Sequence, residues 1–390
     1  MLRMEPETMS TEQQFILERA DLGTLIVALR EAGYATFGPV ERDRAIVYEE
    51  IESVDELPVG WTEEQEGGTY RLKRRADEAV FGFTVGPHSW KKYLFPPEQR
   101  LFRARKVGGR IEFENETTAP RKMAFIGVRS CELAAIAVQD KVFSGGPFLD
   151  SVYGTRRANT FIVAVNCGLA AKTCFCESMN TGPRATGGFD LSLTEVVRGD
   201  RHYFVVETGS EAGRAILAPL PHRAASDKER AASMAATQRA RKQMGRKLDT
   251  KGLKELLERN LEHPQWDKIA DRCLSCANCT MVCPTCFCST VEDVTDLTGD
   301  HAERWRKWDS CFTIGFSYIV GGSIRSSVKS RYRQWLTHKL STWHDQFDTS
   351  GCVGCGRCIT WCPVAIDLTR EVEVIRKTGR RVPPPDTEIS

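Results

Sequence analysis

The hydrophobic pattern of the first 220 residues contains segments of both helical and strand-like character. Apolar side chains recur at three- and four-residue intervals at Leu22, Leu25, Ile26, Leu29 and Tyr34. This spacing places them on one face of a helix, which Gly33 can end. The short apolar runs at 123–128 and 160–166 are partly β-branched and bounded by polar or turn residues, as buried strands are. The runs at 188–197 and 201–209 predict further strands.

A helix is predicted directly after the first of these buried strands. Ser130 is a suitable N-cap for the apolar segment CELAAIAVQDKVF that follows it. Strands that alternate with helices are typical of α/β proteins. We therefore predict a mixed α/β (α+β) fold for residues 1–220, which contain four cysteines.

Residues 221–250 differ in composition from the segment before them. They are rich in Ala, Arg, Lys, Gln and Met, which are strong helix formers, and Ser226 with Glu229 forms a possible capping box. Such a basic helix could dock an acidic partner, but charge runs of this kind more often mark a solvated linker. We predict a basic helical linker here.

The pattern of the remaining chain favours helices. Leu253, Leu256, Leu257 and Leu261 mark a short amphipathic helix, and the segments PQWDKIADRC and VAIDLTREVEVIRK also have helical character. The stretch between these two segments shows little strand alternation. The prediction is a mostly helical domain over 251–380, followed by a flexible tail over 381–390.

Composition places the 390-residue chain among ordinary globular proteins of two or three domains, with 41% hydrophobic and 27% charged residues. The net charge of +2 gives no bulk electrostatic reason to expect nucleic acid or an anionic membrane as a partner. No apolar run approaches the roughly 18–20 residues that span a bilayer. The segment MLRMEPETMSTEQQF lacks the apolar core of a signal peptide. We therefore expect a cytoplasmic protein without a membrane span.

Fifteen cysteines change this ordinary picture. A reducing cytosol disfavours structural disulfides, and an odd total cannot form a fully paired framework. Clustered cysteines in such a compartment more often bind metal or carry out redox chemistry. Metal binding is therefore the favoured interpretation.

Two segments repeat one cysteine spacing. Residues 273–284 read CLSCANCTMVCP and residues 352–363 read CVGCGRCITWCP, so both follow C-x2-C-x2-C-x3-C-P. In two-cluster ferredoxins the first three cysteines of such a run bind one 4Fe-4S cluster and the fourth binds the other. The predicted ligands are Cys273, Cys276, Cys279 and Cys362 for one cluster, and Cys352, Cys355, Cys358 and Cys283 for the second. Structural zinc sites more often use two separated Cys-x2-Cys pairs, so they fit these unbroken runs poorly.

A third 4Fe-4S cluster is predicted in the N-terminal half. Its candidate ligands are Cys131, Cys167, Cys174 and Cys176. The first two each follow a predicted strand, and parallel neighbouring strands would bring both thiols to one edge of the sheet. Four ordinary buried or surface thiols are the alternative. Iron analysis distinguishes these interpretations, since about twelve irons per chain support a third cluster and about eight exclude it.

Three cysteines remain unassigned, and two of them lie in a repeated tetrapeptide. TCFC occurs at 173–176 and again at 285–288, so Cys286 and Cys288 repeat the pattern of the N-terminal pair, while Cys311 stands alone. Three thiols cannot complete an all-cysteine cubane. They could form a site with a non-cysteine ligand such as Asp309 or His301, but packing beside Cys283 is the favoured interpretation.

The chain resembles the iron–sulfur beta subunits of soluble NAD(P)-linked nickel–iron hydrogenases, also called sulfhydrogenases or sulfur reductases. It is also similar to the related A-type subunit of anaerobic sulfite reductase. The resemblance rests on CLSCANCTMVCPTCFC, VEDVTDLTGDHAERWRKWDSCF, GCVGCGRCITWCPVAIDLT, VRSCELAAI, NCGLAAKTCFCESMNTGP and GPHSWKKYLFPP. It implies an electron-transfer protein with two kinds of partner: a flavin/NAD(P)-binding subunit on one side, and the small and large subunits of a hydrogenase, or sulfite reductase subunits, on the other.

The residues themselves favour an electron carrier over a catalyst. No G-x-G-x-x-G follows a predicted strand and no G-x-x-x-x-G-K-[ST] is present, so we expect no flavin or nucleotide on this chain. The seven histidines lack metal-ligand spacing, and no catalytic residue is predicted. A scaffold or nucleic-acid-binding protein with structural clusters is the alternative from another class. Clusters that never change redox state in the physiological range would favour that alternative.

Overall fold

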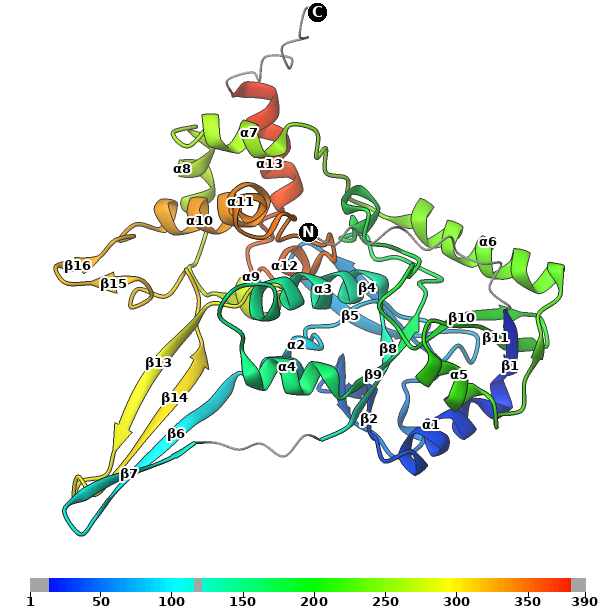
Figure 1. The fold of residues 1–390 in the computed structure, drawn as a ribbon. Helices are drawn as coiled ribbons and strands as arrows, with labels where there is room; N and C mark the ends of the chain where they lie inside the picture. The colour runs from blue at the N-terminus through cyan, green and yellow to red at the C-terminus, as the bar shows by residue number, and fades with distance from the viewer. Residues whose placement is uncertain (1–13, 116–120, 380–390) are drawn as a thin grey trace, which may run out of the picture.

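The computed structural model describes residues 14–115 and 121–379, and the predicted tail at 381–390 lies outside them (Figure 1). An eight-stranded sheet forms the N-terminal half, in the order β12-β1-β11-β10-β9-β8-β2-β3. Its strands are β1 (Phe15–Glu18), β2 (Ala35–Arg42), β3 (Ala45–Glu50), β8 (Met123–Val128), β9 (Thr160–Val165), β10 (Leu191–Arg198), β11 (Arg201–Thr208) and β12 (Arg223–Ala224). The predicted helix and all four predicted strands of this half are present, and the α/β class is confirmed.

The centre of this sheet is parallel and buried on both faces. β2, β8, β9 and β10 are parallel neighbours, whereas the outer pairings are antiparallel. Along β8, Ala124 and Ile126 enter one hydrophobic core, while Met123, Phe125 and Val128 enter another. A central strand with helices and loops on both faces therefore needs a continuous apolar run, which is the pattern that predicted it.

Helices cover the sheet and build the C-terminal half. They are α1 (Leu22–Glu31), α2 (Lys91–Leu94), α3 (Ser130–Ser144), α4 (Ser151–Ala158), α5 (Glu211–Leu217), α6 (Asp227–Gln243), α7 (Leu253–Arg259), α8 (Gln265–Ala270), α9 (Asn278–Met281), α10 (Val328–Thr337), α11 (Trp343–Phe347), α12 (Arg357–Thr360) and α13 (Leu368–Thr378). Within the described residues, none of them has the length and apolarity needed to cross a membrane.

Two helix starts test the capping predictions. The capping box of Ser226 and Glu229 is present at the start of α6, whose Ala232 packs into the core beside β10 and β11. The N-cap of α3 is Arg129, so the prediction of Ser130 at this position is wrong. Ser130 is the first helical residue, and its hydroxyl donates to the carbonyl oxygens of Thr181 and Arg184 at 2.8 Å. The serine anchors a loop rather than the helix.

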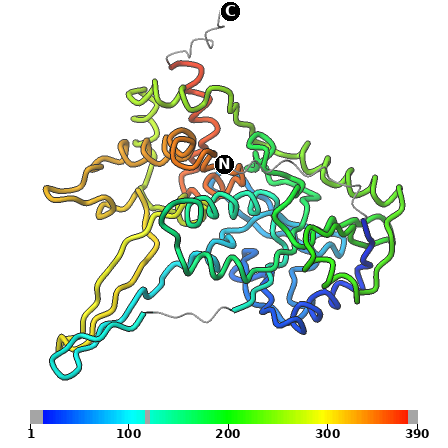
Figure 2. Tube along the Cα trace, viewed as in Figure 1, coloured from blue at the N-terminus to red at the C-terminus, as the bar shows by residue number. Residues whose placement is uncertain are grey.

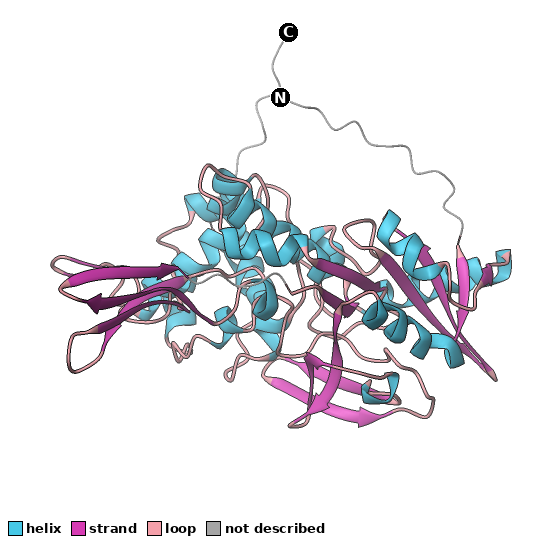
Figure 3. Cartoon of the chain, turned by 60° about the horizontal axis from the view of Figure 1, so that its bottom comes forward, coloured by secondary structure: helices cyan, strands magenta, loops and turns pink. Residues whose placement is uncertain are grey.

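A four-stranded antiparallel arm projects from one end of the molecule (Figures 1 and 3). Its order is β13-β14-β6-β7, with β6 (Glu98–Val107), β7 (Arg110–Asn115), β13 (Ser289–Thr295) and β14 (His301–Trp308). The antiparallel pairing of β6 with β14 places segments about 200 residues apart side by side (Figure 2). Two further hairpins are β4 (Trp61–Glu66) with β5 (Thr69–Arg74), and β15 (Tyr318–Ile319) with β16 (Gly322–Ser323).

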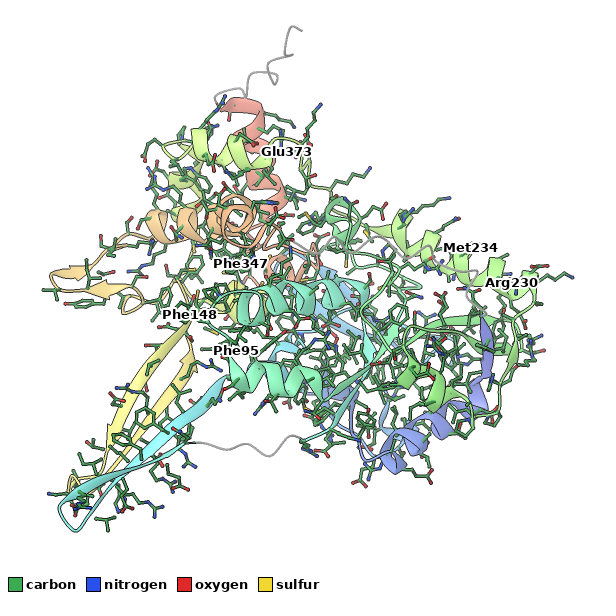
Figure 4. The ribbon with its side chains drawn as sticks, viewed as in Figure 1. Phe95, Phe148, Arg230, Met234, Phe347 and Glu373 are labelled. Carbon is green, nitrogen blue, oxygen red and sulfur yellow. The ribbon has the colours of Figure 1, made fainter. Side chains whose placement is uncertain are left out.

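The arm corrects the prediction for the C-terminal half. The segment between the two cysteine runs was expected to show little strand character, yet it supplies β13 and β14. A mostly helical domain over 251–380 is therefore not confirmed. The base of the arm is held by aromatic packing, because Trp308 stacks on Phe95 and donates its Nε1–H to the Phe95 carbonyl oxygen at 3.0 Å (Figure 4).

Candidate metal centres

The first set of predicted ligands lies around one apolar pocket. The side chains of Cys273, Cys276, Cys279 and Cys362 all line it. Phe312, Tyr332 and Trp335 form part of its remaining wall. Burial, reinforced by the neighbouring cysteines, raises the pKa of Cys279 well above its usual value. The pocket therefore holds its thiols neutral until a metal binds and displaces their protons.

Left-handed backbone shapes the loop that carries three of these cysteines. Ser275 has φ 51° and Ala277 has φ 64°, both in the region that favours glycine. Such conformations cost of order 1–3 kcal/mol each and persist where the surroundings impose them. The loop then enters the short helix α9, which contains Cys279. These two strained residues turn the chain so that three thiols line one pocket.

The second set gathers around the loop that precedes α12. The sulfur of Cys358 is electrostatically coupled to Cys352, Cys355 and Cys283, so the structure brings all four together. Burial raises the pKa of Cys352 to about 12. In contrast, a hydrogen bond from the Cys286 thiol lowers the pKa of Cys283. Each cysteine run thus contributes its fourth cysteine to the other run's set, as the spacing predicted for the polypeptide.

A buried lysine lies beside the second set. Lys339 is 3% exposed, and its Nζ donates to the Cys283 sulfur at 3.3 Å and to the Gly351 carbonyl oxygen at 3.0 Å. Burial works against its charge, but the neighbouring cysteines, Cys283 foremost, raise the pKa of Lys339 well above its usual value. A fixed ammonium at this position stabilises negative charge on the sulfurs.

The N-terminal set also comes together. Cys131 lies in the first turn of α3 and Cys167 follows β9, and the parallel pairing of β8 with β9 brings both to one edge of the sheet. The sulfurs of Cys174 and Cys176 are coupled to Cys167, and that of Cys131 is coupled to Cys176. Burial is the main cause that raises the pKa of every thiol in this set.

Buried arginines accompany these N-terminal thiols. Arg129 is 1% exposed, contacts the Cys167 thiol and donates to the carbonyl oxygens of Phe81 and Phe83 at 3.1 and 2.7 Å. Arg357 is fully buried beside the Cys355 thiol. Dry thiols next to fixed cations match an anionic iron–sulfur cluster, since the cations offset the cluster's negative charge.

The two TCFC segments enclose the loop of the second set from two sides. In the first segment, the Phe175 amide donates to the Gly354 carbonyl oxygen at 2.9 Å. In the second, the Thr285 hydroxyl donates to the Gly351 carbonyl oxygen at 2.6 Å. The N-terminal set therefore lies next to the second set, with Cys355 coupled to both. The first set lies on the other side, because Cys358 is also coupled to Cys279.

This enclosure predicts a specific effect of a methyl group at Gly354. Gly354 has φ +64°, and a Cβ there would lie 2.6 Å from the Phe175 carbonyl oxygen and 2.7 Å from the Cys176 Cα. Both contacts are with backbone, so Gly354→Ala is expected to push the N-terminal set away from the loop and destabilise the protein by more than about 1 kcal/mol. The measurement is the free energy of unfolding under anaerobic conditions.

Gly146→Ala is the matched control for this substitution. A methyl group at Gly146 would have no atom within 4 Å, and the backbone there is not left-handed. The stability of this variant is therefore expected to stay within about 0.5 kcal/mol of the unchanged chain. Equal stability of the two variants would contradict the close packing of the Gly354 loop against the first TCFC segment.

An ion pair joins the loop of the second set to the sheet. The Arg357 Nη2 donates to the Glu132 Oε1 at 2.5 Å, and both side chains are buried. Its guanidinium also donates to the carbonyl oxygens of Gly86 and His88 at 2.8 and 2.9 Å, while the Tyr48 hydroxyl donates to Glu132 at 2.9 Å. The pair therefore connects elements from three parts of the chain.

A further contact joins the same halves near the surface. Phe347, at the end of α11, lies beside α3 (Figure 4), and Lys141 on α3 donates to the Phe347 carbonyl oxygen at 3.2 Å.

Four buried cations near the thiols were missed by the sequence analysis. They are Lys91, Arg129, Lys339 and Arg357. A single charged residue carries no periodic signal, so only the folded contacts identify it.

The three unassigned cysteines lie beside the second set. The Cys286 thiol contacts that of Cys283, as expected for packing beside it, and the thiols of Cys288 and Cys311 hydrogen-bond to one another. Of the two non-cysteine candidates, His301 is at the far end of β14 and is exposed, so it is not part of this group. Across residues 14–115 and 121–379, no three His, Cys, Asp or Glu side chains are grouped to hold a single metal ion.

Comparison with known proteins places these centres in context. A family model described as a 4Fe-4S dicluster domain matches residues 272–366. The chain is 30% identical over 356 residues to Sulfhydrogenase 2 subunit beta of Pyrococcus furiosus, which covers 90% of this chain and 94% of that protein. No solved structure matches the chain. The matched domain contains both cysteine runs, whereas the relative extends the similarity to the N-terminal thiols.

Proposed function

Because the chain belongs to the family of iron–sulfur beta subunits of sulfhydrogenases, we propose that it carries electrons between the hydrogenase subunits of one complex and its flavin/NAD(P)-binding subunit. The observation that carries this proposal is the gathering of three four-thiol sets around one loop. A bound 4Fe-4S cluster supplies one-electron transfer, with a potential set by hydrogen bonds, burial and nearby charge.

Each thiol set has residues suited to hold such a cluster. The first cluster is assigned to Cys273, Cys276, Cys279 and Cys362, and the second to Cys352, Cys355, Cys358 and Cys283. The third is assigned to Cys131, Cys167, Cys174 and Cys176. The apolar wall of the first pocket excludes water, and Lys339 and Arg129 supply positive charge beside the other two sets. Residues 1–220 and 251–380 would thus act as two functional parts joined by the segment 221–250.

The spatial order of the three sets suits a relay. The second set lies between the N-terminal set and the first set, and Cys276 of the first set is exposed. Electron carriers in such a row need one end near a protein surface, where a partner can approach. The proposal therefore assigns a partner contact to the surface around Cys276.

Purification of the native complex tests the proposal as a whole. The expected complex contains hydrogenase subunits together with a flavin subunit, and hydrogen reduces NAD(P)+ through it. Sulfite-dependent NAD(P)H oxidation without hydrogenase subunits would assign the chain to a sulfite reductase instead. Iron–sulfur absorption that stays unchanged throughout a redox titration would exclude an electron carrier and favour a structural role.

The third cluster has a separate test in Cys174→Ser. The Cys174 thiol is buried among the N-terminal set, and its replacement is expected to remove about four irons and four acid-labile sulfides per chain. Iron and sulfide analysis of the anaerobically purified chain measures this loss. Thr155→Ser, which changes a side chain on α4, is the control and should retain all iron. Unchanged iron in Cys174→Ser would remove the third cluster and leave the two in the C-terminal half.

A further inference from the structure

The base of the arm brings three cysteines of unassigned role together. β13 begins at Ser289 and β14 ends at Trp308, and these two residues are paired in the hairpin register. The Asp309 amide then donates to the Cys288 carbonyl oxygen at 2.8 Å. The hairpin therefore closes a loop of chain and places Cys311 against Cys288, whose thiols hydrogen-bond to one another.

The second TCFC segment repeats the spatial role of the first. Thr173 and Thr285 are both fully buried, and each anchors its segment to the second-set loop or to α12 behind it. The first segment then delivers two thiols to the N-terminal set. The second delivers Cys286 and Cys288 to a group that Cys311 completes. The same tetrapeptide, docked on the same loop, thus presents paired thiols on both sides of it.

A second buried lysine lies at this group. Lys91 is 4% exposed, its Nζ donates to the Cys286 carbonyl oxygen at 3.0 Å, and it lies 3.8 Å from the centroid of the Trp308 ring. Among the described residues, neither Lys91 nor Lys339 forms an ion pair with a carboxylate. A buried ammonium is costly by several kcal/mol unless negative charge lies nearby.

The two lysines serve different sulfurs. Lys339 donates directly to Cys283, which belongs to the second set, so that set already has its cation. Lys91 lies instead at the backbone of Cys286, on the side of the three unassigned cysteines. Its burial there is explained if these three residues are thiolates, and thiolates in a dry interior persist when they bind metal.

We propose that Cys286, Cys288 and Cys311 bind an additional iron–sulfur centre, beyond the three assigned to electron transfer, with Lys91 compensating its negative charge. Three cysteines leave one coordination position for a non-cysteine ligand. This arrangement replaces the expectation that the second TCFC segment serves only as packing beside Cys283.

Iron analysis of Cys288→Ser and Cys311→Ser tests the inference. Each variant is expected to lose the same amount, about two to four irons with matching sulfide, and the double variant should lose no more than either single one. Ser289→Ala, the next residue along the chain, is the control and should retain the full content. Full iron and sulfide in both cysteine variants would overturn the proposal, as would the loss of zinc instead of iron.

Two further measurements keep the result interpretable. The unchanged chain must hold more than about twelve irons, so a total of twelve overturns the inference even if the variants fail to fold. Combining Cys288→Ser with Cys174→Ser should remove the iron of both centres additively. The Cys174 loss alone reports on the proposed relay, so either hypothesis can fail without the other. Lys91→Met is expected to lower occupancy of the additional centre, and Lys91→Arg to restore it.

Discussion

Replacing Cys276 with serine is expected to remove one 4Fe-4S cluster, about four irons per chain, and to interrupt electron transfer through the complex. Cys276 lines the pocket of the first set together with three other cysteines. A serine hydroxyl is a harder and less acidic ligand than a thiol, so it replaces thiolate poorly on iron. Hydrogen-dependent reduction of NAD(P)+ should fall to background, because the first set occupies the exposed end of the row.

Dye reduction separates loss of the relay from loss of the complex. The flavin subunit in the assembled Cys276→Ser complex should still pass electrons from NAD(P)H to an artificial dye at the unchanged rate. Asp271→Asn, an exposed change just before the same cysteine run, should preserve iron content and both activities. If dye reduction disappeared while all subunits remained assembled, the assignment of this chain as a relay would be wrong.

The parts of the fold that could be predicted are those with a local signal. β8 and β9 are continuous apolar runs, because a central parallel strand is buried on both faces. The cysteine runs carry their own spacing, which is enough to group eight cysteines into two sets. The parallel order of two strands then brings Cys131 and Cys167 together.

The arm could not be predicted, because its strands depend on distant pairing. β14 places Arg304, Arg306 and Lys307 among half-buried tryptophans, so neither face shows a clean apolar stripe. Its partner β6 lies about 200 residues earlier in the chain. Pairing between such strands satisfies the backbone without the alternating pattern that prediction from a single sequence needs. The same lack of local signal concealed the buried lysines and arginines.

Removing Arg357 is expected to destabilise the protein by about 3–5 kcal/mol, since it leaves the Glu132 carboxylate buried without its cation. Arg357→Met retains much of the side-chain volume but breaks the bond to Glu132 and those to the carbonyl oxygens of Gly86 and His88. The loop of the second set would then lose its connection to the start of α3, where Cys131 lies. We expect a lower free energy of unfolding and loss of iron from the N-terminal set.

A double variant identifies the cause of this loss. Adding Glu132→Gln to Arg357→Met removes the unpaired charge, so part of the lost stability should return, although the carbonyl hydrogen bonds do not. Arg370→Met is the control, because Arg370 is largely exposed and its ion pair with Asp367 spans 3.7 Å. Its effect should stay within about 0.5 kcal/mol. If the double variant were less stable than Arg357→Met alone, an unpaired Glu132 would not be the cause, and the carbonyl hydrogen bonds of Arg357 would carry the effect.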